Sequence, residues 1–494
     1  MSGLRLWIAD AHDEGAVSAQ DWTPQVIRLR WRLGFTDADQ AVAPIGEAEA
    51  ELHDPYIAHP DRLAAWQALL GRRVQIRRGQ TPLFTGYVWS IEPSLGRWAS
   101  GRAVLRARDV LAALDAAPLE APPLRQARAD DWIAHVLAHT RRLPPVLQGR
   151  WLLGRARLRQ DARLARLRQA QTQTGISRLG LLDGCDALRV LEAIARVVEA
   201  EGGRFFVDEG GALRFLNRHA ALRPTALRAT LDEAWEAAEW QEQPVVGRVQ
   251  VRLRPRSSGT QAQIIWRMAQ PLSLGPGETR RVLAYFLTPE GQPLSVEGLQ
   301  TPRRGQDYQA ISLGHPQHAA QLEAVLSAIS PSSAAIDWRN NSASRVVVQA
   351  GATLRATPIQ QGAPLVVEET ALDAEARYSA HTLLLNLPAL DDVEQARARA
   401  RYLLARLRQP RALLRSIRLT TPQHAALLTS ARLMDALRLR LHQPTHDRRY
   451  LLIGVEAQAE AGRWWATWRL APLEEKRFWA LGQARLRQDS TLAY

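Results

Sequence analysis

Alternation of apolar and charged residues is the feature that most limits the folds open to this chain. The segment VIRLRWRL starts at Val26 and places an apolar residue at every second position, with arginine between them. Successive side chains of a β-strand point to opposite faces of a sheet, so this period of two predicts a half-buried strand. Its buried face would consist of Ile27, Leu29, Trp31 and Leu33, and its charged face of Arg28, Arg30 and Arg32.

More segments with strand character follow at regular spacing. GEAEAEL repeats the alternation with Glu47, Glu49 and Glu51, and RVQIRR, PLFTGYVWSI and RAVLRAR come after it with turn residues between them. Short strands at such spacing are typical of small antiparallel barrels and sandwiches. Residues 24–108 are therefore predicted to form a compact barrel or sandwich, followed by a short helix that begins at Asp109.

The next part of the chain, residues 119–243, changes to a helical period. DDWIAHVLAHTRR has helical spacing, and GCDALRVLEAIARVVEAEGG has one apolar stripe, formed by Leu188, Leu191, Ala195 and Val198. Asp186 is suited to cap this second helix, and Gly202 and Gly203 to end it. RFFVDEGGALRFLNR places two apolar runs around a glycine-rich turn, which predicts a hairpin. The region is predicted to be an α+β insertion.

Short β-branched runs return after residue 243. VVGRVQVRLRP, TQAQIIWRM, TRRVLAYFL and SRVVVQ predict a β-sandwich of immunoglobulin-like size. DDVEQARARARYLLARLRQ then predicts a helix that begins near Asp391 and stops at Pro410, because proline lacks the N–H that a helix needs. ALLRSIRLTT, ALRLRLH, YLLIGVEAQ and RWWATWRLAP predict a last small β domain.

The predicted fold class is mainly β with α+β insertions. The predicted domains are residues 1–118, 119–243, 244–385 and 386–494. A chain of 494 residues is too long for one core, since cores stop growing near ~250 residues. Its 46% hydrophobic and 23% charged residues are ordinary for a soluble globular protein. The single cysteine, Cys185, excludes a disulfide or a thiolate metal cluster within one chain.

Membrane and export signals are not expected. No stretch approaches the ~18 apolar residues of a membrane-spanning helix. The start, MSGLRLWIADAHDEG, lacks the basic and apolar regions of a signal peptide. The chain is therefore expected to be made in the cytoplasm, with no membrane-spanning segment.

The order of the segments resembles one protein family, the tail-tip or baseplate hub proteins of long-tailed phages. These are often called minor tail proteins and are related in fold to the hub of contractile tails. In that family a strand leads to an Asp-Pro turn, then Gly-Arg-x-Val and Leu-Phe-x-Gly, as in GEAEAELHDPYIAHP and LLGRRVQIRRGQTPLFTGYVWSIEPSLG. VQVRLRPR, ARARARYLLARLRQPRALLRSIRL and YLLIGVEAQAEAGRWWATWRLAP follow in the family's order, so the resemblance covers residues 24–482.

The resemblance implies a structural virion protein of the tail tip, not an enzyme. In such a hub, two tube-like β-barrels, here residues 24–115 and about 410–482, stack in a ring continuous with the tail tube. With two barrels in each subunit, a homotrimer forms a ring with pseudo-six-fold symmetry, which matches the hexameric tube. A hexamer of the distal-tail type is the variant of this prediction. The implied partners are a distal tail or tail-tube protein, the tape-measure protein, a tail fibre or receptor-binding protein, and DNA in transient passage through the channel.

Arginine supplies nearly all of the positive charge. Of 64 basic residues only Lys476 is a lysine, and the formal net charge is +14. Arginine pairs with carboxylates and phosphates, which suits a protein interface or a polyanion. A codon bias of the source genome explains the same usage, and both interpretations stay open.

The stretch from Leu152 to Gln173 is a basic amphipathic segment that does not fit the family pattern. Its arginines are Arg155, Arg157, Arg159, Arg163, Arg166 and Arg168. They predict either contact with DNA phosphates or, as the favoured interpretation, a solvated helix face paired with acidic neighbours.

Three histidine pairs have a spacing that metal ligands can share. They are His135 with His139, His315 with His318, and His442 with His446. A zinc site needs a third ligand, and HVLAH lacks the glutamate of HExxH. Surface or interface histidines are therefore the favoured interpretation, and no metal site is predicted.

Signatures of catalysis are weak. The sequence contains no GxSxG, no GxxxxGK[ST], and no GxGxxG after a strand. The neighbouring carboxylates Asp391 and Asp392, and Glu368 and Glu369, lie where a helix cap or a strand end accounts for them. No catalytic or cofactor-binding residue and no cofactor is predicted. The alternatives from other classes are a basic DNA-binding or DNA-guiding protein and a tip-associated cell-wall hydrolase, which needs two facing carboxylates.

Four tryptophans fall on strand positions that alternate with polar residues: Trp31, Trp89, Trp464 and Trp468. Tryptophans at such positions are expected in the core or in a subunit interface.

Overall fold

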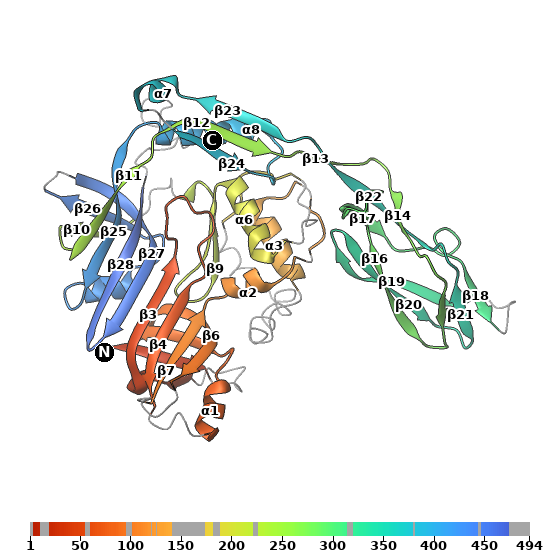
Figure 1. The fold of residues 1–494 in the computed structure, drawn as a ribbon, viewed down its shortest axis with the longest axis horizontal. Helices are drawn as coiled ribbons and strands as arrows, with labels where there is room; N and C mark the ends of the chain where they lie inside the picture. The colour runs from red at the N-terminus through yellow and green to blue at the C-terminus, as the bar shows by residue number, and fades with distance from the viewer. Residues whose placement is uncertain are drawn as a thin grey trace.

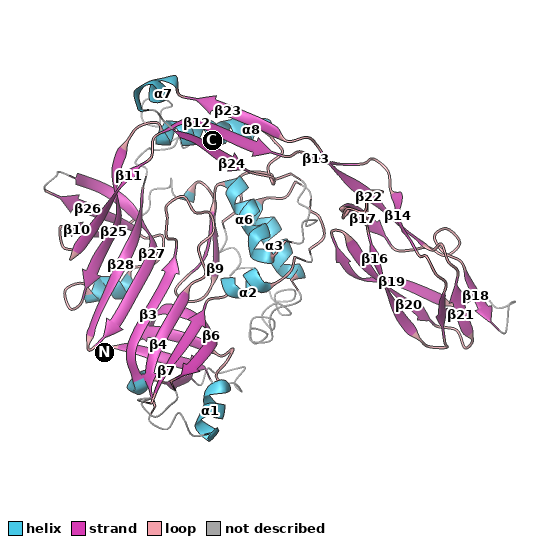
Figure 2. Ribbon diagram, in the orientation of Figure 1, coloured by secondary structure: helices cyan, strands magenta, loops and turns pink. Residues whose placement is uncertain are grey.

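The computed structural model describes residues 3–9, 19–54, 60–94, 101–119, 121–124, 126–140, 173–180, 188–220, 226–313, 320–378, 381–442 and 446–473. Strands dominate these ranges, which confirms the mainly β class (Figure 2). Most of the chain forms a body around one hydrophobic core. The described residues of 256–361 form an arm that extends to one side and has a second core (Figure 1).

One large sheet runs through the body. Its strands are β1 (Leu4–Ala9), β2 (Ala19–Asp21), β3 (Val26–Gly34), β4 (Glu47–His53), β5 (Arg73–Arg78), β6 (Thr81–Pro93), β7 (Arg102–Arg108), β10 (Leu227–Asp232), β11 (Ala237–Gln243), β25 (Arg411–Thr420), β26 (Ala436–Leu441), β27 (His446–Glu460) and β28 (Arg463–Pro472). The strands are ordered β11, β25, β28, β27, β3, β4, β7, β6, β5, β1 and β2, while β26 pairs with β27 and β10 with β26.

The sheet joins the two ends of the chain. β3 pairs antiparallel with β27, from Arg28 opposite Glu460 to Gly34 opposite Gly454. Strands from the first and last parts of the sequence therefore lie side by side, red and blue in Figure 1. We call this pairing the joint.

The prediction of two tube-like barrels, residues 24–115 and about 410–482, is wrong in that form. Among the described residues neither strand group closes on itself, and the sheet stays open with β11 at one end and β2 at the other. The physical reason is that β3 has two edges, and it uses one for β4 and the other for β27. No edge of β3 is left to close the first group.

The core face of the joint alternates large and small side chains across strands. Trp31 on β3 lies opposite Ala48 on β4 and Ala457 on β27. Trp464 of β28 packs here, with its ring centroid 6.1 Å from that of Trp31. Both indoles are buried, so their apolar area stabilises the contact between the two strand groups.

The described helices lie around the sheets of the body. They are η1 (Thr23–Gln25, a 3₁₀ turn), α1 (Pro60–Gln67), α2 (Leu111–Ala116), α3 (Ala129–His139), α6 (Val190–Glu201), α7 (Leu372–Tyr378), α8 (Val393–Leu407) and α9 (Ala425–Ser430). α2 and α3 pack against α6 (Figure 1). In the described ranges, no helix combines the length and the apolar character needed to cross a bilayer.

Helix α6 shows where its sequence pattern succeeded and where it failed. Gly202 ends it in the left-handed conformation, with φ of 74°, as predicted. The predicted stripe is confirmed in part: Leu188 and Val198 are buried, while Leu191 and Ala195 are only half-buried. Val190, Ile194 and Val197 are buried in addition. The helix begins at Val190, and the predicted cap Asp186 lies outside the described residues.

Two smaller sheets complete the body. β8 (Arg204–Val207) and β9 (Leu213–Leu216) form the hairpin that the sequence predicts. β12 (Val246–Leu253) pairs with β23 (Leu365–Thr370) and with β24 (His381–Asn386), and α8 packs against β12 and β23. The carboxylate of Asp392 accepts the N–H of Glu394 at 2.8 Å and so caps α8.

The arm contains three small antiparallel sheets. Its strands are β13 (Arg256–Ser258), β14 (Gln263–Arg267), β15 (Leu272–Leu274), β16 (Thr279–Tyr285), β17 (Val296–Gln300), β18 (Ala310–Leu313), β19 (Leu322–Ser330), β20 (Ser333–Asn340), β21 (Arg345–Val348) and β22 (Thr353–Gln361). β13 and β22 pair with each other where the arm meets the body (Figure 1). Trp338, Phe286 and Leu354 are fully buried in its core.

Asp109 ties the first strands to α2. It is 1% exposed, and its carboxylate accepts the N–H of Gly46 at 2.8 Å and that of Leu111 at 2.9 Å. Burial raises the pKa of Asp109 from 3.8 to about 7, because the charged carboxylate loses its hydration.

We expect Asp109→Asn to lower the stability more at pH 4 than at pH 8. The folded state holds the Asp109 proton up to about pH 7 while the unfolded state releases it near 3.8. The wild-type protein therefore loses stability from this group as pH rises through that window, and the variant does not. Urea unfolding at several pH values measures the difference. A gap between the two proteins that is independent of pH would contradict the assignment.

Candidate functional site

One face of the large sheet carries a regular array of charged and aromatic side chains, which we call the charged face. Its residues occupy alternate positions on neighbouring strands, opposite to the core positions. They are Arg418 of β25, Trp465, Thr467 and Arg469 of β28, Glu456, Gln458 and Glu460 of β27, Arg28, Arg30 and Arg32 of β3, Glu47, Glu49 and Glu51 of β4, Arg102, Arg106 and Arg108 of β7, and Trp89 and Glu92 of β6.

Strand pairing brings these residues into rows that cross the joint. The rows over β27, β3, β4 and β7 are Glu456, Arg32, Glu47 and Arg108, then Gln458, Arg30, Glu49 and Arg106, then Glu460, Arg28, Glu51 and Val104. Side chains directly opposite each other in a sheet interact, and opposite charges attract. The alternation predicted for VIRLRWRL and GEAEAEL is confirmed, and the structure adds the charge order between strands.

Ion pairs form along these rows. Arg32 lies 2.9 Å from Glu47 and Arg28 lies 3.1 Å from Glu51. From β7, Arg106 approaches both Glu49 and Glu92. Exposed pairs of this kind contribute only about 0–1 kcal/mol each, so their main effect is to fix the register. A slip by one residue would put arginine into the core.

The charged face is hollow, and arginine outnumbers glutamate around the hollow. A groove of about 790 Å³ crosses β28, β27, β3, β4 and β7. Its charged lining is Arg30, Arg32, Arg106, Arg108, Arg418 and Arg469 against Glu47, Glu49 and Glu456. Arg30 donates to the amide oxygen of Gln458 at 3.0 Å instead of to a carboxylate. The groove therefore suits a polar or weakly anionic surface, while most of its arginines are already paired.

The tryptophans divide between the two faces of the sheet. Trp31, Trp464 and Trp468 are buried in the core, as expected. Trp89 is 39% exposed on the charged face, where the Arg108 guanidinium lies 4.9 Å from its ring centroid. Val88 is buried, so the alternation of β6 places its neighbour Trp89 on the charged face, and a bulge follows between Val88 and Ser90.

The joint depends on two facing glycines. A side chain on Gly454 would overlap the carbonyl oxygen of Phe35, and one on Gly34 would overlap that of Ile453. Gly34 also has φ of 83°, which disfavours other residues. The two strands can approach this closely only because neither glycine has a Cβ atom.

Two histidines of the three predicted pairs, His135 and His446, contact oxygen atoms of the protein. Across the described ranges of the chain, no group of three or more potential ligands is present. His135 Nε2 lies 2.9 Å from the carbonyl oxygen of Pro122, and His446 Nε2 lies 2.9 Å from the Tyr450 hydroxyl. Burial lowers the pKa of His446. His315, His318 and the side chain of His139 lie outside the part of the chain that the structure describes.

The carboxylate neighbours have structural partners. Asp392 caps α8, Glu368 accepts the amide of Gln250 at 2.7 Å, and Glu369 lies 3.1 Å from Arg401. These contacts are those of a helix cap and a strand end. The basic stretch from Leu152 to Gln173 lies outside the described residues except for Gln173.

Solved structures with a similar arrangement of elements include phage tail proteins, the class that the sequence resembles. A tail protein from Neisseria meningitidis has 10% identity and a TM-score of 0.48, covering 95% of this chain and 96% of that one. A 43 kDa tail protein of a Shewanella oneidensis prophage has 9% identity and a TM-score of 0.47, covering 95% and 98%. A prophage tail protein from Listeria monocytogenes has 7% identity and a TM-score of 0.41, covering 95% of each chain.

The names of these three proteins describe tail components, and none describes an enzyme. No protein-family model and no curated protein matches the sequence.

Sequence reasoning did not find the contribution of β27 to the charged face. Glu456, Gln458 and Glu460 alternate with Ala457 and Ala459 in VEAQAE, the same period as in β4. The signal was present, but nothing in it identifies β3 as the partner strand.

Proposed function

We propose that this chain is a structural subunit of a phage or phage-like tail tip in the virion. It assembles into a ring, or hub, that connects the tail tube to the tip and surrounds a channel for the tape-measure protein and then for DNA. A homotrimer is the proposed state. The body supplies the ring wall, and the described parts of the arm decorate it.

The observation that carries this proposal is the joint. It places a strand group from the start of the chain, β3 to β7, beside a strand group from its end, β25 to β28, in one continuous sheet. Each subunit thereby presents two neighbouring segments of wall, so a cyclic trimer presents a pseudo-six-fold surface. This matches what the sequence resemblance implies for a hub on a hexameric tube.

The open ends of the sheet support assembly with other subunits. β11 and β2 end the strand order, and each has one edge without a partner strand among the described residues. Unpaired edges are ready to pair with another chain, and a closed ring removes them. We propose that the large sheet reaches closure between subunits instead of within one.

The charged face suits a channel wall. Its arginines are largely engaged by glutamates in the same rows, as in the pairs Arg32 with Glu47 and Arg28 with Glu51. A wall of paired charges is well hydrated and holds a phosphate backbone less strongly than free arginines would. Transient passage of DNA requires such weak contact.

The other proposed partners are a distal tail or tail-tube protein and a tail fibre or receptor-binding protein. The four domains, residues 1–118, 119–243, 244–385 and 386–494, remain part of the proposal.

Light scattering of the purified full-length chain tests the proposal. We expect the mass of a trimer, either for the chain alone or after addition of the adjacent tail-tube or distal-tail protein. A hexamer would keep the ring but replace the trimer with the distal-tail arrangement.

Two results would overturn the hub. One is a persistent monomer that ignores tail proteins and binds duplex DNA with an affinity that falls steeply with salt, as a DNA-guiding protein does. The other is clearing of peptidoglycan by the purified chain, which a cell-wall hydrolase would give.

A further inference from the structure

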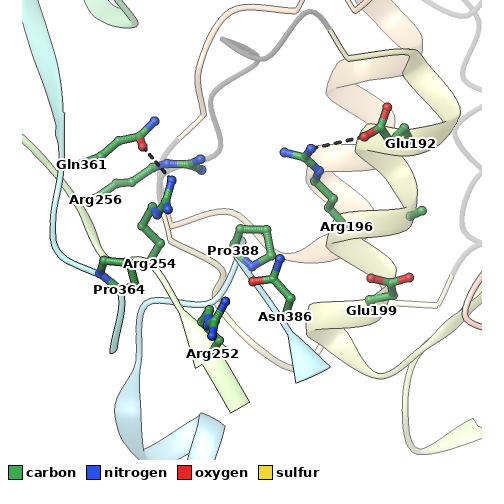
Figure 3. Close-up of a pocket in the computed structure, with 11 residues that line it drawn as sticks. Glu192, Arg196, Glu199, Arg252, Arg254, Arg256, Gln361, Pro364, Asn386 and Pro388 are labelled. Carbon is green, nitrogen blue, oxygen red and sulfur yellow. Dashed lines mark hydrogen bonds and ion pairs between the residues drawn. The ribbon is translucent and has the colours of Figure 1, made fainter. Parts of the chain in front are cut away.

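A cleft of about 540 Å³ lies between helix α6 and the root of the arm (Figure 3). One wall is formed by the end of β12 and the start of β13, and the other by one face of α6. β13 and the end of β22 are the two strands by which the arm leaves the body (Figure 1). Residues of both the body and the arm therefore line the cleft.

The strand wall of the cleft is positively charged. Arg252, Arg254 and Arg256 occupy every second position along this segment, and all three line the cleft. Arg254 donates to the amide oxygen of Gln361 at 3.3 Å. Within the described ranges, neither Arg252 nor Arg254 has a carboxylate partner, and both are exposed. Most other strand arginines of the body, such as Arg32 and Arg106, do have one.

The helix wall is mixed in charge. Glu192, Arg196 and Glu199 lie on one face of α6 at spacings of four and three residues. Arg196 pairs with Glu192 at 3.2 Å, and its charge also acts on Glu199. The cleft thus has a row of three cations facing a wall that is close to neutral.

The period of the arginine row selects an extended polymer as ligand. Arg252 lies at the end of β12, Arg256 begins β13, and Arg254 lies between the two strands. Alternate residues of extended backbone are about 6.6 Å apart, so an extended peptide with acid at every second position is the ligand that this spacing favours. Each matched carboxylate would form charge-assisted hydrogen bonds, which are among the stronger polar contacts.

A single-stranded nucleic acid fits the cleft less well. None of the described residues that line the cleft is aromatic, so no platform for base stacking is present. Glu199 would also lie close to a second row of phosphates.

We propose that this cleft binds an extended acidic segment of a partner protein, with alternate carboxylates on Arg252, Arg254 and Arg256. The bound segment would contact α6 in the body and β13 in the arm together. Its binding would therefore hold the arm at one angle to the body. This proposal goes beyond the ring and does not depend on it.

Fluorescence anisotropy with the full-length chain tests the proposal. The probe is a labelled peptide of alternating glutamate and threonine. The variant is Arg252→Gln with Arg254→Gln, and the matched control is Arg339→Gln with Arg345→Gln, which removes two exposed strand arginines of the arm far from the cleft. We expect the cleft variant to weaken binding by about ten-fold or more, and the control to leave it within about two-fold. Circular dichroism confirms that both variants fold.

A labelled oligothymidine, inorganic phosphate and a scrambled peptide with its glutamates clustered provide the discriminating comparisons. Tighter binding of the alternating peptide than of the oligothymidine supports the proposal. An equal loss of peptide affinity in the cleft variant and in the control variant would mean that the peptide is attracted by the overall positive charge. That result would overturn the proposal. Tighter binding of oligothymidine at the same arginines, or competition by phosphate alone, would overturn the peptide assignment in favour of a nucleic acid or an anion site.

Discussion

Gly454→Ala is expected to lower the free energy of unfolding of the body by about 3 kcal/mol or more. The added methyl group would overlap the carbonyl oxygen of Phe35, a backbone atom that cannot rotate away. Relief requires β27 to move from β3, which weakens the only pairing between the two strand groups among the described strands. Denaturant unfolding followed by tryptophan fluorescence measures the change, because Trp31 and Trp464 are buried at the joint.

Gly259→Ala is the matched control for this prediction. Gly259 also lacks the left-handed conformation, and a Cβ atom there would lie 3.6 Å from its nearest neighbour, in ordinary contact. The control should change the stability by less than about 1 kcal/mol. If Gly454→Ala unfolds at the wild-type midpoint, the close approach of β3 and β27 is not required. A ring assembled from the variant should also dissociate more readily, which light scattering would detect.

Trp338→Ala is expected to destabilise the arm by about 3–5 kcal/mol while the body keeps its stability. Trp338 is fully buried and packs edge-to-face on Tyr308, with ring centroids 4.9 Å apart. The arm core and the body core share no buried residue, and two strands connect them. Calorimetry should therefore show one transition moved to lower temperature and another unchanged.

Tyr285→Ala tests the specificity of that result. Tyr285 is also aromatic and also in the arm, but its side chain is 60% exposed, so its removal should cost less than about 0.5 kcal/mol. If Trp338→Ala moves every transition together, then arm and body unfold as one unit. That outcome would mean that the third predicted domain, residues 244–385, contains no part that is stable independently of the body.

The local structure was predictable where the spacing of apolar residues and the residues that end an element indicate the same structure. Leu29, Trp31 and Leu33 are buried because their strand alternates strictly, and Gly202 ends α6 because only glycine enters the left-handed conformation at low cost. The stripe of α6 was misplaced in part because VLEAIARVVEAE has apolar residues on most of its circumference. In such a helix the contacts with α2 and α3 decide which residues are buried, and the period does not.

The arrangement of strands was not predictable from these patterns. β3, β4 and β27 all show the same alternation, so each is compatible with several neighbours. The order is decided by the fit of Trp31 between Ala48 and Ala457 and by opposite charges such as Arg32 and Glu47. These are properties of pairs far apart in sequence. The barrel prediction failed for this reason, since it assumed that each strand group pairs only within itself.

The candidate site was predictable in part. Sequence alternation located the arginines of β3 and the glutamates of β4, and it left out β27 and the cleft at the arm root. Arg252, Arg254 and Arg256 alternate in VRLRPR, and VVGRVQVRLRP was predicted as a strand, but the alternation does not show what these side chains face. Only the packing of α6 against this segment shows that the three side chains face a common space.

The joint also has a consequence for biosynthesis. Arg30 and its partner Gln458 are 428 residues apart, so β3 leaves the ribosome long before β27 is made and can pair with it. Until then β3 is an exposed edge, and the indole of Trp31 lacks its neighbour Trp464. A chain truncated before residue 446 should therefore aggregate through this edge. We therefore expect nascent copies on neighbouring ribosomes to be able to pair through the free edge of β3 until β27 is made.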